Sequence, residues 1–332
     1  MNADMLKAMF KKFNSYIFLM SGRVSFKQQV RYGIGVIYNF LLYNATISDY
    51  FELGFYRKRY YEKKQYITSK QALYFAEHID SPELLKKYNS KKTMYKSLEP
   101  YIKRDQLYTD ECTLKDFCDF VEKHPRFLYK PDVSDCGRGI EVWDKDSLPI
   151  EVLYENATKN PAVLDELIEQ HSDLSALNPS SVNTIRIFTL MIGEDCRIIG
   201  AVLRIGNGTT VVDNYSAGGL VGSINTDTGC VIDDAEDVIG RHYAMHPQSK
   251  INIKGFQIPN WSLVLEFVRE CAAEYGLKYV AWDIAVRKDD CVLVEANPDG
   301  MVNVIQIAGA GGRKRQYKEL EIEYDKYQTR SK

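Results

Sequence analysis

Residues 279–299, YVAWDIAVRKDDCVLVEANPD, decide the fold of this chain. Two apolar runs rich in β-forming residues, 279–286 and 291–297, flank the charged segment RKDD, and this pattern predicts a β-hairpin. If the loop spans the three residues 288–290, Arg287 lies opposite Cys291 and Asp283 lies opposite Glu295. Side chains alternate between the two faces of a strand, so Glu295 and Asn297 share one face.

This hairpin predicts a metal site. Directly opposed Cβ atoms lie about 5 Å apart, where two carboxylates repel each other unless a cation sits between them. The oxygens of Asp283, Glu295 and Asn297 are hard ligands, which suit Mg²⁺. The alternative is an acidic hairpin with its charges in water. It is less favoured because both carboxylates stand inside apolar strands, where an unpaired charge is costly to bury.

Several motifs in the sequence resemble those of a known family. A strand Asp followed about a dozen residues later by Glu-x-Asn resembles the magnesium hairpin of the ATP-grasp superfamily. Closer similarity, to the sugar-transfer-associated ATP-grasp family, lies in HP at 246–247, Gly255, IP at 258–259, Trp261, AWDIAV, VEANPDG and Gln306. This family occurs among genes for bacterial polysaccharide assembly. The similarity covers roughly residues 90–312 and is densest from 178 to 306.

The resemblance implies an α+β fold of ATP-grasp type, in which two lobes built on antiparallel sheets follow a helical N-terminal region. We expect this helical region over 1–88, the small lobe with the phosphate loop over 89–168, and the large lobe with the metal hairpin over 169–312. The segment 313–332 is a charged tail, either a solvated helix or partly disordered. The amphipathic helix that begins after Asn260 should pack behind the metal hairpin.

Composition limits the classes of function. The 332 residues carry 45 acidic and 43 basic side chains, so no overall basic field favours nucleic acid. Seven scattered cysteines without a CxxC pair are typical of reduced cytosolic thiols. No apolar run reaches the ~18–20 residues of a membrane span. The start, MLKAMFKKFNSYIFLMSG, predicts a packed helix, with a basic amphipathic helix on a membrane surface as the alternative. We therefore expect a cytoplasmic protein, with the inner face of the membrane as the alternative location.

Residues 127–143, FLYKPDVSDCGRGIEVW, are two strands joined by a connector with glycines, which let backbone N–H groups approach phosphate closely. Lys130 ends the first strand and can act as a point charge for phosphate. The stretch resembles the ATP-grasp phosphate loop, although Cys136 stands where the family often has serine. The resemblance assigns Lys130, Ser134, Gly137 and Gly139 to the nucleotide.

Two further segments are assigned to the nucleotide by the resemblance. A family lysine reaches the phosphates from the predicted helix 89–104, and Lys92, or Lys91 beside it, fits that position. A solvated lysine pair is the alternative. Residues 162–171 predict a strand leading into the hinge between the lobes. Here Asp165, Glu166 and Ile168 are the candidates to contact adenine.

Two mid-strand arginines require anionic partners, because a buried guanidinium without one is costly. The resemblance implies that Arg186 and Arg204 are catalytic and face the ATP phosphates or an acyl-phosphate intermediate. A structural ion pair with Asp or Glu is the alternative. The family segment at 213–219 implies that the substrate lies near the rim formed by Asn214, Ser216, Gly218 and Gly219. We expect His246 to be structural or substrate-facing and to bind no metal.

The resemblance implies an ADP-forming carboxylate–amine ligase that uses ATP and Mg²⁺. Its substrates would be a carboxylate, such as a uronic acid, and an amino acid or other amine, in the biosynthesis of a bacterial capsule or other polysaccharide. One alternative is a kinase of the same fold that phosphorylates a hydroxyl. Another is a non-catalytic subunit of a glycan assembly complex, which the intact set Asp283, Glu295 and Asn297 disfavours.

Overall fold

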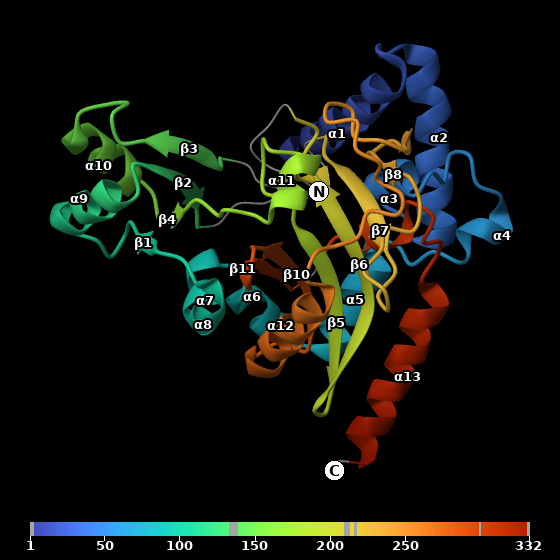
Figure 1. The fold of residues 1–332 in the computed structure, drawn as a ribbon. Helices are drawn as coiled ribbons and strands as arrows, with labels where there is room; N and C mark the ends of the chain where they lie inside the picture. The colour runs from blue at the N-terminus through green and yellow to red at the C-terminus, as the bar shows by residue number, and fades with distance from the viewer. Residues whose placement is uncertain (1–2, 133–138, 209–212, 216–217, 299, 331–332) are drawn as a thin grey trace.

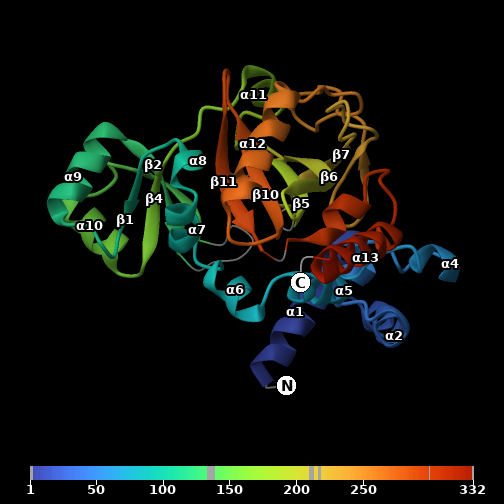
Figure 2. The same ribbon diagram turned by 90° about the horizontal axis from the view of Figure 1, so that it is seen from below.

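The computed structural model describes residues 3–132, 139–208, 213–215, 218–298 and 300–330. The N-terminal region consists of helices, and a capping box at Ser25 begins the second of them. Figure 1 shows this region in blue to teal beside a central sheet, and Figure 2 shows it from below. Its helices are α1 (Ala3–Ser21), α2 (Phe26–Tyr43), α3 (Ile47–Glu52), α4 (Tyr60–Lys63), α5 (Ser69–Ile79) and α6 (Pro82–Lys87).

The small lobe is a four-stranded antiparallel sheet in the order β1-β4-β2-β3. Its strands are β1 (Gln106–Tyr108), β2 (Arg126–Pro131), β3 (Glu141–Asp144) and β4 (Ala162–Glu166). Helices α9 (Leu114–Lys123) and α10 (Ile150–Thr158) cover it around a small apolar core that includes Phe117, Phe127 and Leu164. The predicted helix 89–104 is instead two short helices, α7 (Lys91–Ser97) and α8 (Glu99–Ile102), because Pro100 cannot continue the first one.

The large lobe is a seven-stranded antiparallel sheet in the order β11-β10-β5-β6-β7-β8-β9. Its strands are β5 (Ile185–Ile192), β6 (Asp195–Ile205), β7 (Leu220–Ile224), β8 (Ala235–Glu236), β9 (His242–Tyr243), β10 (Tyr279–Val286) and β11 (Cys291–Asn297). The helix α11 (Ser172–Leu177) leads into it, and the 3₁₀ helix η2 (Val302–Gln306) follows it. These two antiparallel sheets and the helical N-terminal region confirm the predicted fold class.

The two faces of this sheet pack into two different cores. Ile185 and Ile187 point into a core shared with α12 (Trp261–Glu274). Phe188 and Leu190 point into the other core, which the N-terminal helices and α13 (Lys314–Arg330) complete. Helix α12 therefore packs behind the hairpin, as predicted, and the N-terminal region covers the opposite face.

The hairpin β10–β11 pairs Asp283 with Glu295 and turns at the segment RKDD, as predicted, but the assumed three-residue loop 288–290 is wrong. Val286, and not Arg287, lies opposite Cys291, so residues 287–290 form the turn. The register shifts between Asp283 and Ile284, and Val294 is the extra residue of a β-bulge. The bulge restores the pairing of the two carboxylates that a regular strand with this turn would have lost.

The C-terminal segment forms α13, which packs along α5 and is not a solvated tail. Its buried residues Tyr317, Leu320 and Tyr324 recur every three or four positions. The predicted boundaries after residues 88, 168 and 312 all fall between elements, and the division into these parts stays a prediction. Within the described residues, no helix combines the length and apolar character of a membrane span, and the described cysteines are free thiols.

Candidate active site

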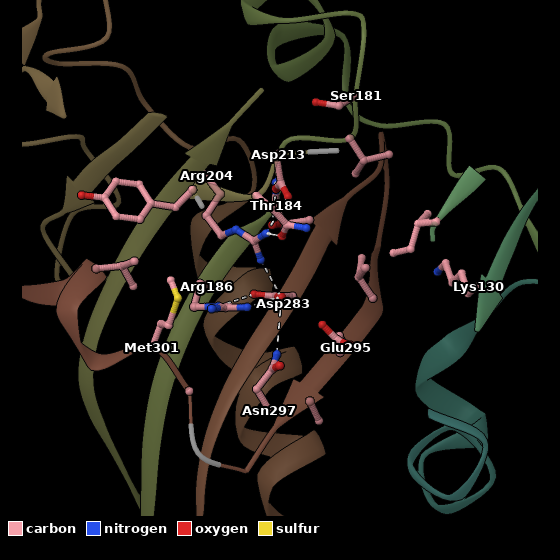
Figure 3. Close-up of a pocket in the computed structure, with 18 of the residues that line it drawn as sticks. Lys130, Ser181, Thr184, Arg186, Arg204, Asp213, Asp283, Glu295, Asn297 and Met301 are labelled. Atoms are coloured by element: carbon pink, nitrogen blue, oxygen red, sulfur yellow. Dashed lines mark hydrogen bonds and ion pairs between the residues drawn. The ribbon is translucent and has the colours of Figure 1, made fainter. Parts of the chain in front are cut away.

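A cavity of about 2640 Å³ lies between the two lobes. Lys130 reaches it from β2 of the small lobe, and Arg186, Asp283 and Glu295 reach it from the large sheet (Figure 3). The wall continues along the N-terminal region, where Tyr16 of α1 and other residues of α1, α3 and α5 line the cavity. The cavity therefore collects side chains from the N-terminal region, the small lobe and the large lobe.

A buried ion cluster forms the large-lobe wall. Arg186 donates from Nε and Nη2 to the two carboxylate oxygens of Asp283, at 2.7 and 2.6 Å. Arg204 donates from Nη1 to the same carboxylate at 2.7 Å, and its Nη2 forms an ion pair with Asp213 at 2.8 Å. The backbone N–H of Thr184 donates to Asp213 at 2.9 Å. The neighbouring strands β5, β6 and β10 thus bring Arg186, Arg204 and Asp283 together, and Asp213, which follows β6, completes the connected set.

The charges in this cluster hold one another in their ionised forms. Burial alone would raise the pKa of Asp283, but Arg186 and Arg204 outweigh it and lower the pKa below its usual value. Burial would lower the pKa of Arg204, and the carboxylates of Asp213 and Asp283 raise it instead. The sequence analysis gave a structural ion pair with Asp or Glu as the alternative role of Arg186 and Arg204. In this structure both arginines do form such ion pairs.

The three proposed metal ligands differ in what surrounds them. Both carboxylate oxygens of Asp283 already accept hydrogen bonds from arginines. The amide nitrogen of Asn297 lies 3.5 Å from one of these oxygens, Oδ2. Glu295 has a side chain that is 33% exposed and lies 3.6 Å from the Lys91 ammonium. Carboxylate and amide oxygens are the donors that Mg²⁺ prefers, so the donor set fits. Glu295 and Asn297 line the cavity. A metal ion bound by Asp283 would compete with Arg186 and Arg204 for its carboxylate oxygens.

The small lobe contains a second ion cluster. Arg104 donates from Nε and Nη2 to Asp165 at 2.7 and 2.9 Å, and Lys130 pairs with the same carboxylate. Burial alone would raise the pKa of Asp165, but Arg104 and Lys130 lower it to about 2. The Asp165 side chain is fully buried and lies outside the cavity wall, so it fixes Lys130 instead of facing adenine.

The neighbours of Asp165 do line the cavity. Glu166 accepts from the backbone N–H of Asp105 at 2.9 Å and forms part of the wall at the end of β4. Ile168 follows it in the segment that joins the lobes and also lines the cavity. The structure thus brings two of the three candidates for adenine contact to the predicted place.

Of the two candidate lysines on α7, Lys91 lines the cavity and Lys92 does not. Lys91 is buried at the cavity wall and approaches Glu295. Lys92 points the other way, and its ammonium pairs with Asp110 at 2.6 Å and Glu111 at 2.7 Å outside the cavity. Adjacent residues of a helix are rotated by about 100° from each other, so the two lysines leave α7 in different directions.

The glycine segments are only partly described. Ser134, Gly137 and Ser216 lie outside the described residues. Gly139 has a φ of +72° and leads into Ile140 and Val142 of the cavity wall.

The residues predicted to form the substrate rim differ in their positions relative to the cavity. Asn214 lines the cavity and accepts from Arg204. Neither Gly218 nor Gly219 lines it. A Cβ atom at Gly219 would lie 2.4 Å from the Asp213 carbonyl oxygen, so this glycine allows the tight turn that holds Asp213 and Asn214.

Sequence reasoning missed several polar residues of the site. Arg104 carried no signal because its partner Asp165 is distant in sequence, and Asp213, which begins the family segment at 213–219, was given no role although it pairs with Arg204. Glu52 lies on the cavity wall, accepts from Asn303 at 2.9 Å and has a pKa that burial raises. His246, expected to be structural or substrate-facing, is fully buried, and its Nε2 lies 2.9 Å from the Gly206 carbonyl oxygen.

Several solved structures are similar to this one. A complex of the ATP-grasp ligase PsnB with a phosphomimetic variant of its minimal precursor, Mg and ADP has a TM-score of 0.47 and 15% identity over 77% of this chain and 66% of the other. An ADP complex of purK, N5-carboxyaminoimidazole ribonucleotide synthetase, has a TM-score of 0.43 and 10% identity over 70% and 52%. This chain therefore spans about two thirds of the first structure and about half of the second.

A third neighbour is a RiPP-associated ATP-grasp ligase from Chryseobacterium gregarium, in complex with ADP and a leader and core peptide. It has a TM-score of 0.41 and 14% identity over 75% of this chain and 63% of the other. No curated protein matches the sequence. The model of the family described as "Sugar-transfer associated ATP-grasp" matches residues 56–321, a longer range than the motifs covered. The chain belongs to the sugar-transfer-associated ATP-grasp family.

Proposed function

We propose that the protein is an ADP-forming carboxylate–amine ligase that takes ATP and Mg²⁺ and amidates a sugar carboxylate, such as a uronic acid, with an amino acid or other amine. The reaction belongs to bacterial polysaccharide biosynthesis, and its place is the cytoplasm. Membership of the family and the cationic inter-lobe cavity support this proposal.

The observation that carries the proposal is the arrangement of cations around Asp283, Glu295 and Asn297. Lys91, Lys130, Arg186 and Arg204 all line one cavity, from both lobes. A polyphosphate between the lobes would meet these cations on two sides, and charge placed in advance stabilises a phosphoryl transfer without reorganisation. The bidentate fork of Arg186 shows that this side chain is already fixed in direction.

The reaction balances as two transfers. A carboxylate oxygen of the sugar acid attacks the γ-phosphorus of ATP, and the bond to the β-bridging oxygen breaks, which gives ADP and an acyl phosphate. The amine nitrogen then attacks the acyl carbon, inorganic phosphate leaves, and one proton is released with the amide. The lining arginines and lysines would hold the phosphate oxygens, and positioning supplies much of the rate.

Magnesium would be held by Glu295 and Asn297, together with Asp283, and would offset negative charge on the phosphate oxygens. Lys91 stands beside Glu295 and adds a positive charge at the same wall. The paired arginines keep Asp283 ionised, so a carboxylate with a low pKa is present at any physiological pH.

The proposal is tested by ADP release from Mg²⁺-ATP with a panel of uronic acids, with hydroxylamine in place of the amine. An acyl phosphate converts hydroxylamine into a hydroxamate, which is detected directly. Hydroxamate formation that disappears in Arg186→Ala is expected. A stable phosphoester without an amine requirement would identify a kinase instead. No ADP release with any acid would contradict both enzyme assignments.

A further inference from the structure

Helix α2 carries an apolar stripe on its solvent side. Phe26, Val30, Ile34, Ile37 and Leu41 recur every three or four residues, and their exposed fractions range from 44% to 81%. Helix α2 lies at the outer edge of the molecule in both views (Figures 1 and 2). A helix of a globular protein normally turns such a stripe inward, so a large exposed one indicates an interaction surface.

The helix before it has the same character. Residues 4–12 of α1 are all exposed, and they include Met5, Leu6, Met9 and Phe10 together with lysines 7, 11 and 12. In Figure 2 this end of α1 extends away from the body of the molecule. The two helices form a hairpin, joined at residues 22–25, that precedes the part of the chain matched by the family.

The charge of this hairpin is one-sided. Residues 3–43 contain six Lys or Arg and a single acidic residue, Asp4, which lies 3.9 Å from Lys7, whereas the whole chain has 43 basic and 45 acidic residues. Within the part of the chain that the structure describes, no carboxylate pairs with Lys11, Lys27 or Arg31. Lys27 and Arg31 directly follow Phe26 and Val30 of the apolar stripe of α2. The surface therefore combines exposed apolar side chains with unbalanced positive charge.

We propose that the α1–α2 hairpin binds the surface of an anionic lipid bilayer. The apolar stripe would enter the boundary between headgroups and acyl chains, and the lysines and arginines would meet anionic headgroups. No described helix can span a membrane, which fits a helix pair lying in the surface plane. A second copy of this chain is a poorer occupant, because a symmetric contact would bring two hairpins of like charge together.

The hairpin also forms part of the cavity, since Met9, Lys12 and Tyr16 of α1 line it. Binding of α1 to lipid would therefore bring a wall of the candidate active site to the bilayer. The membrane proposal itself stands on the exposed stripe and the charge alone, whatever reaction the cavity supports.

Vesicle flotation of the full chain tests the proposal. Vesicles of phosphatidylglycerol mixed with phosphatidylcholine should bind at least about tenfold more protein than vesicles of phosphatidylcholine alone, and high salt should weaken the binding. Val30→Glu together with Ile34→Glu should lower binding about tenfold or more. The matched control is Val152→Glu on α10, a valine with a similar exposed fraction of 39% in the small lobe, which should bind as the wild type does.

Absence of wild-type binding to the anionic vesicles would overturn the proposal, and so would an equal loss in Val152→Glu. A stable dimer in light scattering that Ile34→Glu converts to monomers, without vesicle binding, would assign the hairpin to self-association instead. ATP binding by each variant is measured in parallel. Retained ATP binding with lost flotation separates the membrane surface from the nucleotide site and shows that the variant is folded.

Discussion

Both lobes contain a buried aspartate between two cations, but the two aspartates face different surroundings. In the small lobe, Asp165 is fully buried between Arg104 and Lys130 and lies outside the cavity wall. In the large lobe, Asp283 lies between Arg186 and Arg204 on the wall itself. The first aspartate is closed off from the cavity, whereas the second is open to it.

The difference follows from the number of carboxylates and from access to the cavity. Asp165 is the only carboxylate that pairs with Arg104 or Lys130 among the described residues. Arg204 has a second carboxylate in Asp213, and Arg186 reaches the cavity. A charge network with a spare carboxylate can lose one contact at lower cost than a closed triad. We therefore interpret the small-lobe cluster as a fixed support and the large-lobe cluster as an exchangeable site.

The largest expected effect is on the free energy of unfolding. Asp165→Asn leaves two buried cations without a carboxylate and should lower the free energy of unfolding by about 3–5 kcal/mol. Asp283→Asn should cost less, about 1–3 kcal/mol, because Asp213 still pairs with Arg204. Urea unfolding of both variants measures the two losses. Equal losses would remove the distinction between the two clusters.

A smaller effect should separate the two lysines of α7. Lys91→Ala removes a cation from the cavity wall and should weaken ATP binding about tenfold, the loss of one charge-assisted contact. Lys92→Ala is the matched control, because its ammonium pairs with Asp110 and Glu111 outside the cavity, and it should change affinity less than twofold. Calorimetric titration with ATP compares them. The reverse order would restore Lys92 as the phosphate ligand.

The smallest predicted effect is a dependence on pH. The pKa of Asp165 is about 2 in the folded protein and near 4 in the unfolded chain, so its stabilising contribution is complete above pH 4 and is lost as pH falls toward 2. The difference in unfolding free energy between wild type and Asp165→Asn should shrink by about 1 kcal/mol between pH 7 and pH 3. Urea unfolding at both values measures it. A difference that does not change with pH would mean that Asp165 is not held ionised.

Local patterns predicted the elements that carry their own signal. The alternation in 279–297 indicated the hairpin, and the opposition of Asp283 and Glu295 was predicted correctly. The loop was assumed one residue too short, because the bulge at Val294 has no signature in the sequence. The packing of α13 was also hidden, since the apolar residues Tyr317, Leu320 and Tyr324 lie within a strongly charged segment.

Contacts between distant segments could not be predicted. The role of Asp165 depends on Arg104, sixty-one residues away, and the sequence alone offered only a carboxylate near a hinge. Lys91 and Lys92 are adjacent, and only the direction of α7 against β11 distinguishes them. The resemblance assigned Arg186 and Arg204 to phosphate, and the structure adds that Asp283 holds both of them in place.

The most direct test of the exchangeable site is Mg²⁺-dependent ATP binding, measured by calorimetry for the wild type and for Glu295→Ala. Glu295 is partly exposed, so its removal should leave the fold intact, and Glu270→Ala on α12 serves as the matched control. We predict wild-type ATP binding that is strengthened by Mg²⁺, an effect that Glu295→Ala loses and Glu270→Ala keeps. ATP binding with the same Mg²⁺ dependence in all three proteins, or no ATP binding at all, would contradict the assignment of this cavity as the nucleotide–metal site.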